Sequence, residues 1–205
     1  LLGLVHPTGG SVDLLGHTLN EANRIALLRQ TGSLIESPSG YLHLTARENL
    51  SIVADLKDVD RKDISRVLEI VHLTKDADRK VGQYSLGMKQ RLGIAMALLG
   101  NPMLLVLDEP LNGLDADGMR IMREVFTDII KDGSRSIIVS SHLLGVLQKV
   151  ATHYGIIRQG KMIMELSAAE MDSRAQVFTS LKCADMQGAK AVLKKQYADV
   201  REEEG

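Results

Sequence analysis

The 205-residue sequence contains one cysteine, four prolines, no tryptophan and only 3% aromatic residues. The single Cys183 excludes an internal disulfide framework and a cysteine-based zinc site, which favours a reducing compartment. Few aromatic rings are available for base stacking, and a formal charge of -1 gives no basic footprint, so nucleic acid is not an expected partner. No apolar run approaches the roughly 20 residues that a membrane-spanning helix requires.

The overall composition, with 44% hydrophobic and 25% charged residues, is typical of a folded protein. The length suits one domain with an appendage, or two small domains. The chain begins Leu1-Leu2-Gly3-Leu4, without an initiator methionine or a secretory signal. This start is typical of the tail of a helix already under way, so we expect the sequence to be a fragment.

The hydrophobic pattern alternates between strand-like and helix-like segments. Thr45-Ala46-Arg47-Glu48 matches a capping box, which predicts that a helix begins there. Other helices are expected from residues 61, 85 and 143, along the apolar stripe of 119–130 and over 187–197. Strands are expected over 11–15, 31–35, 103–107, 136–140, 154–157, 161–166 and 177–182. The runs 103–107 and 136–140 are apolar enough to be buried on both faces. Strands that alternate with helices predict an α/β fold with a mostly parallel sheet.

Two acids, Asp108 and Glu109, follow the apolar run directly. The carboxyl end of a buried parallel strand is where α/β proteins bind ligands. Asp108 can help to hold Mg²⁺ there, and Glu109 can orient or deprotonate a water molecule. The alternative is a pair of acids that only cap the next helix.

Two further segments carry candidate polar groups. Ser85 opens a predicted helix next to Gly87, and free amides at a helix N-terminus can bind an anion. The alternative is an ordinary serine cap on a core helix. His142 follows a predicted strand in Ser140-Ser141-His142 and can hydrogen-bond a terminal phosphate. The alternative is a partly buried capping histidine.

The order of these motifs is specific. Y-S-L-G-M at 84–88, L-L-V-L-D-E-P at 104–110, L-N-G-L-D at 111–115 and S-S-H at 140–142 each occur once, in this order. Over about residues 1–166 the chain resembles the nucleotide-binding subunit of an ATP-binding-cassette (ABC) transporter. The resemblance implies a P-loop NTPase-like cassette, with a mostly parallel sheet flanked by helices and a small helical subdomain at about 45–100. Residues 167–205 would form a C-terminal extension, an incomplete accessory domain.

By this resemblance the segment 104–110 is the Walker B strand, with Asp108 as a Mg²⁺ ligand and Glu109 as the catalytic acid that polarises water. His142 would be the switch histidine that contacts the γ-phosphate. Residues Ser85, Leu86, Gly87 and Met88 would form the signature loop, which binds nucleotide held mainly by a partner chain. Asp115, in the D-loop, would couple the two sites of the dimer.

The resemblance also implies the partners. Two ATPase subunits, as a homodimer or a heterodimer, would sandwich ATP and Mg²⁺ and drive integral membrane permease subunits. The permease would dock near residues 36–45, where Tyr41, Leu42 and Leu44 are apolar. The subunit would lie at the cytoplasmic face of a bacterial-type cell membrane as a peripheral protein.

The sequence departs from the family pattern in the phosphate loop and in the signature. No G-x-x-x-x-G-K-[S/T] motif occurs in the sequence, and Leu1–Gly10 matches the end of the helix that follows this loop in the family. We therefore expect the loop upstream of residue 1, and poor ATP binding and hydrolysis by the fragment alone. Leu86 and Met88 replace a glycine and a glutamine of the usual signature, as in drug and peptide exporters.

A third departure suggests the subfamily. Glu36 stands where most members carry a glutamine, which resembles the variant of lantibiotic-immunity and bacitracin-type transporters. It would place a carboxylate near Mg²⁺ and the permease contact, or else be a solvated loop acid. We expect an ATPase that powers export of a peptide antibiotic or a similar substrate. The alternatives are a degenerate partner that lends its signature loop to another cassette, and an ABC ATPase that is not part of a transporter.

Overall fold

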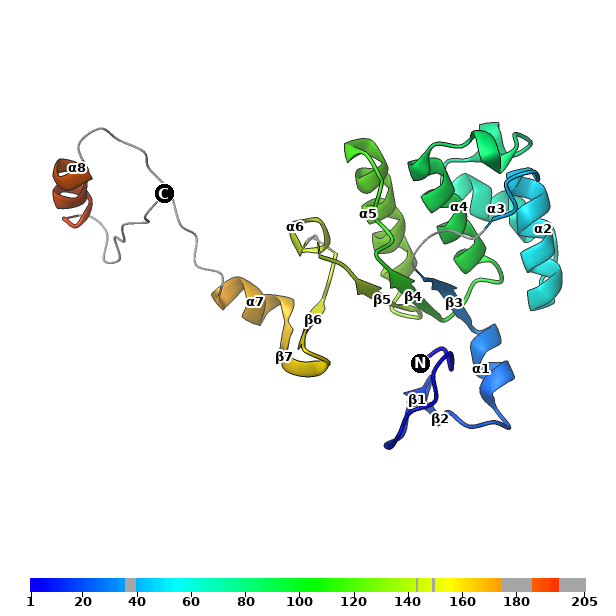
Figure 1. The fold of residues 1–205 in the computed structure, drawn as a ribbon, viewed down its shortest axis with the longest axis horizontal. Helices are drawn as coiled ribbons and strands as arrows, with labels where there is room; N and C mark the ends of the chain where they lie inside the picture. Colours follow the sequence, from blue (N-terminus) through cyan, green and yellow to red (C-terminus); the bar gives the residue numbers. More distant parts are fainter. Residues whose placement is uncertain (36–39, 143, 149, 175–185, 196–205) are drawn as a thin grey trace. The chain divides into compact units, whose positions relative to one another are not determined.

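The structure, a computed structural model, describes residues 1–35, 40–142, 144–148, 150–174 and 186–195. It divides into two compact units, residues Leu1–Ala151 and Thr152–Gly205. Figure 1 colours both units along the sequence. The boundary after residue 166 that the resemblance implies stays a prediction.

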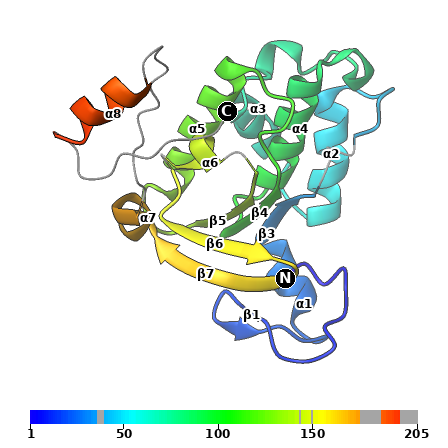
Figure 2. The same ribbon diagram turned by 60° about the vertical axis from the view of Figure 1, so that its left-hand side comes forward.

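A three-stranded parallel sheet forms the centre of the first unit. Its strands are β3 (Thr31–Leu34), β4 (Leu104–Asp108) and β5 (Ser136–Ser140), in the order β3-β4-β5. Figures 1 and 2 show helices α2 to α5 gathered on the same side of this sheet. The predicted α/β fold with a parallel sheet is therefore confirmed.

The two strands that were expected to be buried on both faces, β4 and β5, differ in how far their side chains are buried. In β4 the side chains of Leu104, Leu105 and Leu107 are buried, as predicted, whereas Met103, which precedes the strand, is 41% exposed. The prediction is wrong for β5, where Ile138 is 46% exposed. The physical reason is that Ile137 and Val139 face the core, while Ile138 points to the opposite face of β5, which neither hydrophobic cluster of the described residues covers.

The core of the first unit gathers around α4 (Leu86–Leu98). Helices α2 (Ala46–Lys57) and α3 (Asp63–Ile70) pack against α4, which also contacts β3. Helix α5 (Ala116–Ile130) packs against β5. Side chains buried to below 2% exposure include Leu50, Val67, Leu68, Leu92, Ile94, Leu105, Met122 and Phe126. Because α4 is buried on several sides, its position is fixed by the whole unit.

The capping box predicted at Thr45 is present at the start of α2. The Glu48 amide donates to Thr45 Oγ1 at 3.1 Å, and the Thr45 amide donates to Glu48 Oε2 at 2.7 Å. The short 3₁₀ helices η1 (Thr74–Asp76) and η2 (Val81–Gln83) connect α3 to α4. Helices α2, α3 and α4 with these two turns form a helical block, and its assignment as a separate subdomain stays a prediction.

A cluster of charged side chains holds the C-terminal end of α4. Lys57 Nζ donates to the Leu99 carbonyl at 3.3 Å, and Arg66 Nη2 donates to the Leu98 carbonyl at 3.0 Å. Asp63 accepts from Arg66 Nε at 2.5 Å and from the Gly100 amide at 2.9 Å. The Arg66 hydrogen bond lowers the pKa of Asp63, and burial lowers the pKa of Lys57. Cations at a helix C-terminus also complement its dipole.

The N-terminal segment is less regular than expected. The strand predicted over 11–15 is only β1 (Asp13–Leu14), which pairs with β2 (His17–Thr18). Leu15 ends it with a positive φ of 51°. Helix α1 (Arg24–Arg29) then leads into β3.

The second unit contains an antiparallel hairpin of β6 (His153–Arg158) and β7 (Lys161–Ser167), joined at Gln159 and Gly160. It continues into α7 (Ala168–Arg174) and contains α8 (Met186–Leu193). Short α6 (Leu144–Leu147) belongs to the first unit. The strand expected over 177–182 lies outside the described residues. Within the described part of the chain, no helix is both long and apolar enough to span a membrane.

Candidate active site

The predicted acids lie at the carboxyl end of β4, beside the end of β5. The parallel register pairs Asp108 with Ser140. The Ser140 hydroxyl donates a short hydrogen bond to Asp108 Oδ1. Asp108 is half-buried, and its second carboxylate oxygen has no hydrogen bond among the described contacts. The site therefore presents a carboxylate oxygen at the end of the strand.

Glu109 has a backbone conformation that is unusual for a residue with a side chain. Its φ is +46°, in the left-handed region, which costs free energy unless surrounding contacts hold it. The Glu109 amide donates to the Ser140 carbonyl at 3.1 Å. The Glu109 carbonyl accepts from the Asn112 amide at 3.1 Å and from Gln90 Nε2 at 3.3 Å. Both sides of this residue are thus held by hydrogen bonds.

The Glu109 carboxylate contacts His142, which lies just past the end of β5. Glu109 Oε1 accepts from the His142 amide at 3.1 Å and lies 2.9 Å from His142 Nδ1. The side chain of His142 is 65% exposed and that of Glu109 is 29% exposed. If Nδ1 donates to the carboxylate, the exposed ring can present Nε2 to a ligand.

The residues predicted to form a signature loop lie at the start of α4. The hydroxyl of Ser85 caps this helix, accepting from the Met88 amide at 3.2 Å. Leu86 is 62% exposed, and Gly87 follows in the first turn. Ser85 is therefore a helix cap. Its hydroxyl proton can still donate to an anion.

The segment that precedes α5 lies against the start of α4. Asp115 caps α5 by accepting from the Gly118 amide at 2.8 Å. A Cβ placed on Gly87 would lie 3.3 Å from the Gly113 carbonyl oxygen, so the two backbones are close. The structure thus places Ser85 to Met88 and Asp115 at adjoining helix starts, while Asp108, Glu109 and His142 form a separate cluster.

The metal ligand set is only partly described. Glu36 lies outside the described residues. Among those that the structure describes, no three His, Cys, Asp or Glu side chains gather closely enough to hold a metal ion. Asp108 is a hard oxygen donor, and Mg²⁺ is commonly held by one or two carboxylates together with substrate phosphates. The cluster therefore fits Mg²⁺ only with phosphate present.

Two residues of this cluster were given no role from the sequence, Ser140 and Gln90. Ser140 lies two residues before His142. Because β4 and β5 are parallel and each has five residues, their last residues, Asp108 and Ser140, lie opposite each other, and this could have been predicted. Gln90 lies two residues after the Y-S-L-G-M motif, between Lys89 and Arg91, so the sequence gives no sign that its amide is buried. Its 2% exposure comes from packing of α4 against several elements, which periodicity does not give.

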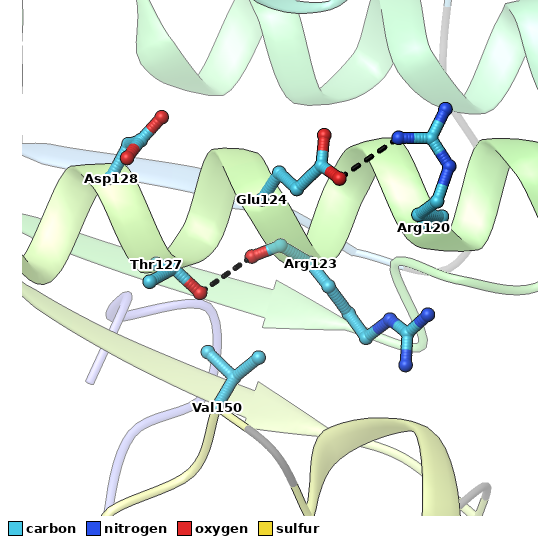
Figure 3. Close-up of a pocket in the computed structure, with 6 residues that line it drawn as sticks. All are labelled: Arg120, Arg123, Glu124, Thr127, Asp128 and Val150. Atoms are coloured by element: carbon cyan, nitrogen blue, oxygen red, sulfur yellow. Dashed lines mark hydrogen bonds and ion pairs between the residues drawn. The ribbon is translucent and has the colours of Figure 1, made fainter.

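An open groove lies elsewhere, along α5 (Figure 3). It is lined by Arg120, Arg123, Glu124, Thr127, Asp128 and Val150. Arg120 Nη1 pairs with Glu124 Oε1 at 2.8 Å across one helical turn. None of the predicted site residues lines this groove.

Comparisons with known proteins agree with the motifs. A family model described as ABC transporter matches residues 1–112. The bacitracin transport ATP-binding protein BcrA of Bacillus licheniformis is 41% identical over 205 residues, which is 100% of this chain and 66% of that protein. The lantibiotic transport ATP-binding protein SrtF of Streptococcus pyogenes is 38% identical over 180 residues, 88% of this chain and 76% of that protein.

A solved structure of the ATP-binding subunit of an ABC transporter shares the fold. Its TM-score is 0.73 at 24% sequence identity, over 84% of this chain and 73% of that one. The cassette fold expected from the sequence is thus confirmed. The chain spans just under two thirds of the length of the BcrA protein, at 66%.

Proposed function

The chain belongs to the ABC transporter family, and from this premise we propose that it is part of an ATP-hydrolysing subunit that powers export of a peptide antibiotic through separate membrane subunits. The observation that carries the proposal is the cluster of Asp108, Glu109 and His142 at the ends of β4 and β5. The similarity to a bacitracin and a lantibiotic transport protein supports the substrate class.

Glu109 is suited to activate water. Its carboxylate is partly exposed and keeps Oε2 free of the His142 contacts, which both fall on Oε1. A carboxylate in this place can accept a proton from an attacking water and orient it. Its left-handed backbone directs the side chain towards the end of β5.

His142 is suited to bind a terminal phosphate. It can donate from Nδ1 to Glu109 and from Nε2 to a phosphate oxygen at the same time only as the imidazolium, because the neutral ring carries one N–H.

Asp108 is the residue that would hold Mg²⁺, together with Glu36 as a further proposed ligand. When bound, Mg²⁺ would neutralise charge on the phosphates. Ser140 fixes the Asp108 carboxylate by its hydrogen bond. No G-x-x-x-x-G-K-[S/T] motif occurs in these 205 residues, so they do not supply a phosphate loop. The roles proposed for them are ATP hydrolysis and the contacts of the signature loop.

The start of α4 would act on nucleotide held by a second ATPase subunit. Ser85 Oγ already accepts from the Met88 amide, and its proton is left to donate to a phosphate oxygen. The first-turn amides of Leu86 and Gly87 add a partial positive charge. Asp115, at the adjoining start of α5, would couple the two sites.

Permease subunits would dock near residues 36–45 and hold the ATPase at the cytoplasmic face of the membrane. Tyr41 and Leu42 are 58% and 55% exposed in the described part of this loop. Apolar side chains in such positions suit contact with a partner helix.

The test uses the product of the complete reading frame, purified with and without Glu109→Gln. We expect Glu109→Gln to lower ATP turnover by about 100-fold or more, with ATP binding retained, because it removes only the general base. Glu69→Gln is the matched control, since Glu69 is exposed on α3. Equal turnover in the two variants, or no turnover in the unaltered protein, would contradict the proposal. Deletion of the gene should also raise sensitivity to bacitracin or a lantibiotic.

A further inference from the structure

Gln90 links α4 to the residue proposed to activate water. It lies within α4, five residues after the cap Ser85, a rise of about 7.5 Å along the helix. Its Nε2 donates to the Glu109 carbonyl at 3.3 Å. No other side chain among the described hydrogen bonds donates to this carbonyl.

The amide of Gln90 is in an environment that disfavours polar groups. Among the described residues it is one of three buried polar side chains, at 2% exposure, and its neighbours Leu92 and Ile94 are fully buried. A buried amide is costly unless it is hydrogen-bonded. An apolar side chain of similar volume would fill the same space without that cost, so packing alone does not explain a glutamine.

The carbonyl that Gln90 contacts belongs to a strained residue. Glu109 has a φ of +46°, and this conformation persists only where neighbouring groups hold it. Ser140 of β5 holds its amide, and Gln90 with the Asn112 amide holds its carbonyl. The direction of the Glu109 side chain follows from this backbone, and that side chain contacts His142.

We infer that Gln90 is a positioning residue, which holds the left-handed backbone of Glu109 and so keeps its carboxylate directed at His142. The inference rests on the proposed function. It also gives α4 a direct mechanical connection to the acid: a displacement of the helix that begins at Ser85 moves the donor on the Glu109 carbonyl.

The test compares three variants of the complete gene product. Gln90→Met keeps the side-chain volume and removes the donor, while Gln90→His restores an N–H at a similar reach. Gln30→Met is the control, because Gln30 is an exposed glutamine after α1. We expect Gln90→Met to lower kcat by about 10-fold or more with KM for ATP within about 2-fold, since small misplacements of reacting groups are costly. Gln90→His should recover part of kcat.

A second measurement does not depend on turnover. Hydrogen–deuterium exchange at residues 109–112 should be faster in Gln90→Met and unchanged in Gln30→Met, because the Asn112 amide donates to the same carbonyl. Unchanged kcat, or a loss of kcat without this local change in exchange, would overturn the inference. If exchange rises but no protein hydrolyses ATP, the proposed function fails and the hydrogen bond alone stands.

Discussion

The close approach of β3 to α4 at Gly32 leads to a sharp prediction about stability. A Cβ on Gly32 would overlap the Ala97 carbonyl oxygen, and it would lie 2.7 Å from Leu105 Cδ2 and 2.9 Å from the Ala97 carbonyl carbon. Leu105 is 1% exposed, and Ala97 contributes helix backbone, so neither can move aside freely. Gly32→Ala must therefore push α4 away from the sheet.

The expected cost can be estimated from two opposing effects. Overpacking a core costs about 1–3 kcal/mol, and an obstacle made of helix backbone favours the upper end, about 3 kcal/mol. Alanine restricts the unfolded chain and returns about 0.4–1 kcal/mol. The net destabilisation is then about 2 kcal/mol, which lowers Tm by about 4–8 °C in a protein of this size.

Thermal unfolding followed by fluorescence or circular dichroism measures this change. Gly9→Ala is the matched control, since a Cβ there meets no atom within 4 Å and its φ lies outside the left-handed region. The control should leave Tm within about 2 °C of the unaltered protein. A Gly32→Ala protein as stable as the control would refute the argument that β3 and α4 are in direct backbone contact.

Two other predictions concern the helical block. Thr45→Ala should destabilise the protein by about 1 kcal/mol in urea unfolding, because it removes the capping box, whereas Ser51→Ala in the same helix should be near neutral. Asp63 has a pKa lowered by Arg66, so its stabilisation is present above its unfolded pKa and lost as the pH falls below about 3.8. The urea midpoint of Asp63→Asn should therefore depend less on pH in this range, and a pH dependence equal to that of the unaltered protein would contradict the assignment.

Local features of the fold could be predicted from the sequence. The capping box at Thr45 needs only two residues three positions apart, and the buried run of β4 needs only its own composition. The site followed from a similar argument, because the carboxyl ends of neighbouring parallel strands share one edge. In the structure the Glu109 carboxylate lies 2.9 Å from the His142 ring, while the roles of both residues stay predictions.

Features that depend on tertiary packing could not be predicted. Ile138 is exposed because no described hydrophobic cluster covers its face of β5. An apolar run in the sequence does not predict which faces of a strand other elements will cover. The contact of Gln90 with Glu109 joins residues 19 apart through the packing of α4. The positive φ of Glu109 could not be predicted from the sequence either, since nothing in Asp-Glu-Pro requires a residue in the left-handed region.

The packing of Leu86 shows how one departure from the family pattern is accommodated. By the resemblance, this leucine stands where the usual signature has glycine, and its side chain lies against Gly113 in the segment before α5. A Cβ on Gly113 would lie 2.6 Å from Leu86 Cγ, and the φ of Gly113 is +74°, which a side chain also disfavours. The space that Leu86 fills at the signature is thus provided by the missing Cβ of Gly113. The two positions are coupled, so a larger residue at 113 is tolerated better when residue 86 is glycine.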